Sequence, residues 1–144
     1  MLQEYRNVYQ IAREATGLTQ EKAAELMDVS VESVRAYEGS KRIPPDKIVI
    51  KMIEIYDARY LAYQHLKTSA EVGQKYLPDF KIQELPIAIL KLQKEVSDFI
   101  KCKDLMVEIT CDGVIDESEK PQWDLILKEL DDVSTAILAL KFAK

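Results

Sequence analysis

The sequence predicts an all-α protein made of two helical modules. Its 144 residues include four glycines and five prolines, too few for the many tight turns of a sandwich or barrel. Apolar residues make up 47% of the chain, and they recur at three- and four-residue intervals, the spacing of one helix face. This apolar content is enough for packed cores and lies outside the range of disordered chains.

The two modules differ in charge. Residues 1–67 carry ten basic and ten acidic side chains, whereas residues 68–144 carry ten and 15, so the second part holds the whole formal net charge of −5. Bulk charge therefore gives no attraction toward phosphates, and a DNA-binding surface would need a local basic cluster. We expect domains at residues 1–67 and 84–144, joined by a linker at 68–83.

Four helices are expected in the first module. The residues expected to face its core are Tyr5, Val8, Tyr9, Ala12 and Ala15 in the first helix, Ala23, Ala24 and Leu26 in the second, and Val31, Val34 and Tyr37 in the third. Gly17 suits a helix C-terminus, and Thr19 and Ser30 are candidates for helix N-caps. A fourth helix runs from Asp46 to about Lys67, and its pattern allows a break near Asp57.

The second module is expected to be a helical hairpin. Its apolar residues alternate at three- and four-residue steps, the pattern of a coiled-coil seam: Leu85, Ile89, Leu92, Val96, Phe99, Met106 and Thr110 in one helix, with Lys103 as a polar interruption, and Trp123, Ile126, Leu130, Val133, Ile137 and Leu140 in the other. The connection between the helices is short, so they must be antiparallel. We expect the hairpin to pack on a copy of itself, on the first module, or on both.

Residues from about Ile11 to Asp46 carry a motif with many elements in one register. The elements are Arg13, Gly17-Leu18-Thr19-Gln20, Ala23-Ala24-Glu25-Leu26, Val29-Ser30, Val34, Glu38 and Pro44. With them the segment resembles the lambda-repressor-like (Cro/repressor, XRE-type) helix-turn-helix family. Physical reasoning agrees, because two short helices joined by about four residues cannot bury themselves and need the first and fourth helices around them.

The resemblance implies binding to double-stranded DNA and assigns residues to it. The expected DNA-binding residues are Gln20, Val31, Glu32, Ser33, Arg35, Ala36, Lys41 and Arg42. Gln20 would bind a phosphate and orient the recognition helix, Lys41 and Arg42 would meet the DNA backbone, and the others lie on the base-facing side. Arg35 could pair with guanine O6 and N7, Glu32 could accept from cytosine N4, and Val31 or Ala36 could touch a thymine methyl group.

Two further positions follow from the resemblance. Arg13 and Glu38 match a family pair that forms an internal salt bridge, so they are assigned to folding. The family's usual glycine after the recognition helix is replaced here by Ser40, with Gly39 one residue earlier. This departure leaves the loop geometry, and the placement of Lys41, open.

The connection in the hairpin has two interpretations. Glu108, Asp112, Gly113, Asp116 and Glu119 resemble the latter part of an EF-hand calcium loop, although glutamate and threonine stand at its first two ligand positions. Alternatively, the segment is a helix-hairpin turn, in which Gly113 ends one helix and Asp116 or Ser118 caps the next. We expect the turn, and no bound metal or cofactor.

No catalytic residues are expected, and the chain is not expected to be an enzyme. P-loop, GxGxxG, GxSxG and HExxH motifs are missing from the sequence. His65 has no nucleophile or second base near it in the sequence, which favours a place at a helix surface or interface. The N-terminus lacks an apolar signal core, and no long apolar run occurs, so we expect a cytoplasmic protein without membrane contact.

The sequence thus indicates a DNA-binding transcriptional regulator, a repressor or a phage lysogeny regulator. It is expected to bind operator DNA as a homodimer or higher homo-oligomer formed through residues 84–144. Two alternatives stay open. The chain could be an antitoxin whose acidic hairpin holds a toxin, or an interaction adaptor whose helix-turn-helix no longer binds DNA.

Overall fold

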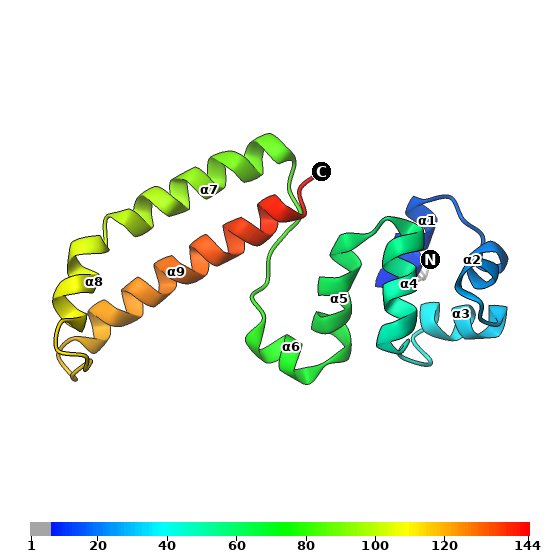
Figure 1. Ribbon diagram of the computed structural model, residues 1–144, viewed down its shortest axis with the longest axis horizontal. Coiled ribbons are helices and arrows are strands. Elements are labelled where there is room, and N and C mark those ends of the chain that lie inside the picture. The colour runs from blue at the N-terminus through cyan, green and yellow to red at the C-terminus, as the bar shows by residue number, and fades with distance from the viewer. Residues whose placement is uncertain (1–6) are drawn as a thin grey trace, which may run out of the picture. The chain divides into compact units, whose positions relative to one another are not determined.

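The computed structural model describes residues 7–144, and these form two helical units (Figure 1). The described residues contain nine helices and no strand, which confirms the all-α fold class. The first unit extends to Leu77 and the second is Pro78–Lys144. No helix within the described part is long and apolar enough to cross a membrane.

The first unit contains six helices. They are α1 (Val8–Ala15), α2 (Gln20–Met27), α3 (Val31–Glu38), α4 (Asp46–Tyr56), α5 (Arg59–Ser69) and α6 (Glu71–Tyr76). The expected N-caps are confirmed: the Thr19 hydroxyl accepts a hydrogen bond from Lys22 N, and the Ser30 hydroxyl accepts one from Ser33 N, each at 3.1 Å. Gly17 ends α1 with a φ of 73°, the left-handed conformation that glycine adopts most easily.

The core of this unit brings α1 to α5 together. Its buried side chains are Tyr9, Ala23, Ala24, Met27, Val34, Tyr37, Val49, Met52, Tyr56 and Leu61. Ala23 and Ala24 are buried as expected, but the assignment of Leu26 to the core is wrong, because Leu26 is about half exposed and Met27 is fully buried instead. Tyr5, expected on the same face of the first helix, lies outside the described residues.

The break near Asp57 is confirmed. Asp57 has a φ of 48° and separates α4 from α5. The expected linker differs from the structure, because α5 continues to Ser69 and α6 lies within residues 68–83. Gly73, an apparent linker residue, is buried where α6 packs on α5, and a Cβ atom there would lie 2.0 Å from the Leu66 carbonyl oxygen.

The second unit is a hairpin built from α7 (Leu85–Ile100), α8 (Lys103–Thr110) and α9 (Lys120–Lys141). α7 packs along α9, and α8 packs against the start of α9 (Figure 1). The first arm, expected to be continuous, is interrupted after Ile100 and resumes at Lys103. At the other end, Phe80 stacks on Phe142 with ring centroids 5.7 Å apart, and Leu85 N donates to Lys144 O.

The expected seam of the hairpin is partly wrong. Leu85, Ile89 and Val96 are exposed, whereas Ala88, which the seam did not include, is fully buried in α7, the helix that packs along α9. A small residue lets two helices approach closely. We therefore interpret Ala88 as a contact point between α7 and α9, with the larger apolar side chains to one side of the contact and open to solvent. The consequence is an open apolar stripe on α7.

Residues 111–119 have the geometry of the turn interpretation. Gly113 has a φ of 80°, and Asp112 Oδ1 accepts a hydrogen bond from Val114 N. Asp116 Oδ1 accepts from both Ser118 and Glu119 backbone nitrogens, and from the Ser118 hydroxyl. These hydrogen bonds, that of the Ser118 hydroxyl first, lower the pKa of Asp116. The carboxylate thus holds the turn before α9, but the expected cap is wrong, because the N-cap of α9 is Glu119 and neither Asp116 nor Ser118.

Candidate nucleic-acid interface

The expected recognition helix, α3, is held by its buried side and exposes the opposite side. Val34 and Tyr37 lie in the core, while Arg35 and Glu32 are exposed on the other side. Val31 is half-buried and packs against the core, so it is less available for a base than the sequence suggested. Ala36 is also half-buried, and its carbonyl oxygen accepts hydrogen bonds from Lys41 N and Arg42 N at 2.9 and 3.2 Å.

A buried ion pair joins α1 to α3, as the resemblance implied. Arg13 Nε and Nη2 donate to the two carboxylate oxygens of Glu38 over 2.6 and 3.0 Å, and the Arg13 side chain also donates to the Leu18 carbonyl. The bidentate bond to Glu38 raises the pKa of Arg13, against the effect of burial. Both side chains are buried, so the pair holds α1 and the loop before α2 against the end of α3.

Tyr56 lies close to this ion pair. Its burial, followed by the negative charge of Glu38, raises the pKa of Tyr56 to about 12, while the charge of Arg13 acts in the opposite direction. The Tyr56 hydroxyl is buried without a hydrogen-bond partner among residues 7–144. Tyr56 therefore contributes to the core as an aromatic ring rather than through its hydroxyl group.

The residues expected to bind DNA form two groups in the structure. In the first group, Arg35 Nε donates to Gln20 Oε1 over 3.4 Å, and Arg35 forms ion pairs with Glu21 at 3.3 Å and Glu32 at 4.0 Å. Glu21 was not expected at this surface. No spacing rule connects it with residue 35, because the contact depends on how α2 crosses α3.

In the second group, Arg42 lies against α3. Its guanidinium carbon is 4.9 Å from the centroid of the Tyr37 ring, and Nη2 donates to the Ser33 hydroxyl over 2.8 Å. Arg42 thus contacts Ser33 and Tyr37 of α3, contacts that the sequence did not predict. Lys41, next to it, is exposed.

The loop after α3 has the conformation that the family's glycine would allow. Ser40 stands at that position with a φ of 56°, while Gly39 has a φ of −85°. Asn7 supports the loop, because its Nδ2 donates to Tyr37 O over 2.6 Å and to the Ser40 hydroxyl over 3.3 Å. The departure from the family pattern thus preserves the loop at the cost of a strained serine.

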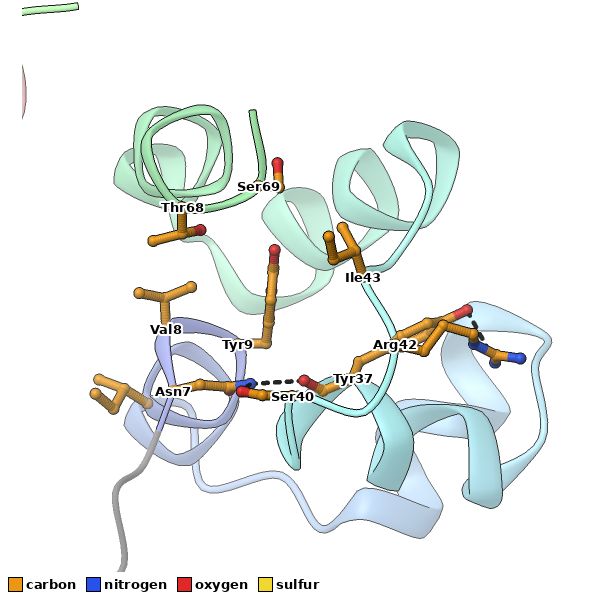
Figure 2. A pocket seen from close by; sticks show the side chains of 10 residues that line it. Asn7, Val8, Tyr9, Tyr37, Ser40, Arg42, Ile43, Thr68 and Ser69 are labelled. Atoms are coloured by element: carbon orange, nitrogen blue, oxygen red, sulfur yellow. Dashed lines mark hydrogen bonds between the residues drawn. The ribbon is translucent and has the colours of Figure 1, made fainter. Parts of the chain in front are cut away.

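The same loop forms one wall of a pocket of about 520 Å³ (Figure 2). Val8 and Tyr9 of α1 lie on a second side, and Thr68 and Ser69 at the end of α5 on a third, as Figure 2 shows. Ile43 completes the apolar part of the lining. The pocket is thus enclosed by α1, the loop after α3 and the end of α5.

His65 is buried at the interface of α5 with α1 and α4, so of the two expected positions the helix surface is wrong and the interface is confirmed. Its Nδ1 lies 2.7 Å from the Tyr9 hydroxyl, and its Nε2 lies 3.2 Å from Asp46 Oδ1 and 3.5 Å from the Ser69 hydroxyl. A nucleophile triad places its acid and its serine on opposite ring nitrogens, whereas Asp46 and Ser69 share one. The Ser69 hydroxyl also donates to the His65 carbonyl over 2.6 Å. The cluster therefore fastens α5 to α1 and α4.

The comparisons with known proteins agree with this geometry. Residues 10–63 match the family model described as Helix-turn-helix, a range that begins within α1 and ends within α5. The comparisons with curated proteins and with solved structures gave no match. Residues 10–63 therefore form a helix-turn-helix of the lambda-repressor-like, XRE type, the type found in a family of DNA-binding transcriptional regulators.

Proposed function

We propose that this protein is a repressor, of which a phage lysogeny regulator is one form, and that it binds operator DNA as a dimer or higher oligomer. The observation that carries the proposal is α3 itself. Its buried side, with Val34 and Tyr37, fixes it on the core, and its exposed side presents Arg35. A helix held in this way fits the major groove with its first residues nearest the base edges.

The proposed contacts divide into positioning and reading. Gln20 at the start of α2 and Lys41 in the loop bind phosphates, which fixes the register of the protein on the duplex. Arg35 reads guanine through its O6 and N7 atoms, with Glu32 accepting from cytosine N4. Arg42, held beside Ser33, is close enough to α3 to take part in either role.

The charged side of the hairpin supports self-association through its other side. The carboxylate oxygens of Glu95 on α7, and of Glu129 and Asp132 on α9, lie within 4.8 Å of one another, so these residues share one face. Lys94 and Asp98, joined at 3.0 Å, belong to the same side of α7. Such a face remains solvated.

The opposite face of the hairpin is apolar and open. At about 100° per residue, Leu85, Ile89, Val96 and Ile100 follow one another on the side of α7 away from its charged residues. Because α9 is antiparallel to α7, the same geometry places Leu127 and Ile137 on the same face of the hairpin. These six side chains are between 37% and 59% exposed.

A second copy is the occupant that we propose for this face. The face is apolar along both helices. DNA is a poor occupant, because its phosphates would lose water there without gaining hydrogen bonds. Two such faces brought together form a four-helix bundle, in which each copy covers the other's open side chains. A twofold dimer would then present two α3 helices to half-sites about one helical turn apart.

We also propose that the protein has no enzymatic activity of its own. The support is the arrangement around His65, whose partners hold helices together instead of activating a nucleophile.

One alternative is favoured by a specific observation. Glu21 and Glu32 both lie within 4.0 Å of Arg35, so the strongest base-reading candidate is already neutralised by carboxylates. A helix-turn-helix that no longer binds DNA would show this arrangement, and the apolar face of the hairpin would then hold a partner protein, such as the toxin of an antitoxin pair.

The deciding experiment is selection of bound duplexes from a random DNA pool by the purified full-length chain at moderate salt. We expect an inverted repeat with half-sites about one turn apart, and an affinity that falls steeply as salt rises. A direct repeat would contradict the twofold dimer. Failure to enrich any sequence at any salt would overturn operator binding and favour the interaction adaptor.

A further inference from the structure

The guanidinium group of Arg35 is surrounded by acceptors from α2 as well as α3. Nη2 lies 3.3 Å from Glu21 Oε1, Nη1 lies 4.0 Å from Glu32 Oε1, and Nε donates to Gln20 Oε1 over 3.4 Å. Arg35 and Glu21 are both more than half exposed. Glu21 is therefore an acidic side chain on the surface expected to meet DNA, and it comes from outside the reading helix.

Phosphates and bases place different demands on this arginine. Any phosphate can accept from a guanidinium, whatever the sequence, and such contacts provide non-specific affinity. A guanine offers O6 and N7 in a geometry that matches two guanidinium donors at once. A carboxylate beside the arginine competes with both acceptors, and it is itself repelled by the phosphates. The carboxylate therefore weakens DNA binding most at sites where only phosphates are available to Arg35.

We infer that Glu21 is a specificity-determining positioning residue, which acts by occupying Arg35 until a correctly placed guanine replaces it. At a non-specific site, Arg35 stays with Glu21 and adds nothing to binding. At the operator, the two hydrogen bonds to guanine compensate for the lost ion pair. The inference rests on the proposed function, because it requires that α3 reads DNA.

The experiment compares full-length wild type, Glu21→Gln and Glu25→Gln on two duplexes, the selected operator and a shuffled version of it. Glu25 is the matched control, since it lies one turn further along α2 and pairs with Lys22 at 3.0 Å. For Glu21→Gln we expect binding to the shuffled duplex to tighten about two- to fivefold, the range that an exposed ion pair produces. The preference for the operator should fall correspondingly.

The salt dependence gives a second measurement. Once released, Arg35 can bind a phosphate of the shuffled duplex, so the slope of log affinity against log salt should steepen by up to about 0.9 in Glu21→Gln. Glu25→Gln should change binding to the two duplexes by the same factor and leave the preference for the operator intact. Glu21→Asp should retain most of that preference, because the carboxylate remains.

A double mutant decides whether Glu21 acts through Arg35. In an Arg35→Ala background, Glu21→Gln should leave the ratio of the two affinities unchanged. A persisting effect in that background, or equal effects of Glu21→Gln and Glu25→Gln, would overturn the inference while operator binding stands. A wild-type protein that does not distinguish the two duplexes would overturn the proposed function, and the inference with it.

Discussion

Gln20 Nε2 donates a hydrogen bond to Glu38 Oε2 over 2.7 Å, which connects the buried ion pair to the surface expected to meet DNA. The Glu38 carboxylate can only accept, so it fixes the amide of Gln20 with its nitrogen inward and its oxygen toward Arg35. Arg13 holds Glu38 in place from the other side. One carboxylate thus serves both the core and the orientation of a phosphate-binding candidate.

Loss of this carboxylate should strongly destabilise the first unit. Glu38→Ala leaves the buried Arg13 without its partner, so we expect the free energy of unfolding to fall by about 3–5 kcal/mol. Urea denaturation followed by circular dichroism measures the change. The double variant Arg13→Met/Glu38→Leu removes both charges and should recover most of the loss. Equal midpoints for wild type and Glu38→Ala would show that the pair contributes little.

Arg35 and Lys41 should affect DNA binding in different ways. Arg35→Ala should cost about 1–3 kcal/mol of discrimination at one base pair, because the bidentate contact to guanine is lost. Lys41→Ala should weaken binding to all sequences alike and reduce the salt slope by about one. Titrations of both variants against the operator and its single-base variants make the comparison. The assignment of the reading face would be wrong if Arg35→Ala kept the wild-type preference at every base pair.

The sequence predicted the helix-turn-helix unit better than the hairpin, for a physical reason. In the first unit, caps such as Thr19 and Ser30 and breaks such as Asp57 are local signals that a sequence shows directly. In the hairpin, alternating spacing gave a wide apolar arc on α7, but it could not indicate which part of the arc meets α9. That choice depends on Ala88, whose small side chain allows close approach of the two helices.

Ser40 should be a site of stored strain. Its φ of 56° is unfavourable for a residue with a Cβ atom, so Ser40→Gly should raise the free energy of unfolding by about 0.5–1 kcal/mol. Ser40→Ala is the matched control, because it loses the hydroxyl bond to Asn7 without relieving the strain. Thermal and urea denaturation compare the three proteins. A glycine variant no more stable than the alanine variant would contradict strain at this position.

The family motif predicted part of the candidate interface. The contacts that depend on tertiary structure could not be predicted from it. Gln20 and Arg35 could be found from the motif. The contacts of Glu21 and Arg42 could not, since one depends on the crossing of α2 and α3 and the other on a loop folding back onto Tyr37. The equal numbers of acidic and basic side chains in residues 1–67 did not reveal that Arg35 lies beside Glu21 and Glu32 on one surface.

The open face of the hairpin should control self-association. Ile89→Glu places a charge in the proposed contact, which costs several kcal/mol if the site is buried in a dimer, so the dimer should dissociate. Leu90→Glu is the control: Leu90 is 66% exposed and neighbours Ile89, but it points to another side of α7. Light scattering after size exclusion gives the mass of each variant. A dimeric Ile89→Glu variant, or a wild-type monomer at all concentrations, would contradict the proposed interface.

Tyr56 should make the protein less stable at alkaline pH. Burial raises the pKa of Tyr56 to about 12 in the folded protein, whereas an unfolded tyrosine has a pKa of about 10. Below pH 10 both states keep the proton. As the pH rises from about 10 toward 12, the unfolded state releases it first, so the free energy of unfolding should fall by up to about 1.4 kcal/mol per pH unit.

Tyr56→Phe isolates this effect. Because the hydroxyl has no hydrogen-bond partner within residues 7–144, its removal should cost little at pH 7. Tyr9 is unchanged in both proteins, and burial raises the pKa of Tyr9 as well, so its contribution cancels in the difference between the two proteins. Urea denaturation at a series of pH values gives that difference. It should be flat below pH 10 and then increase in favour of the phenylalanine variant; a difference that stayed constant to pH 12 would mean that Tyr56 ionises equally in the folded and unfolded states.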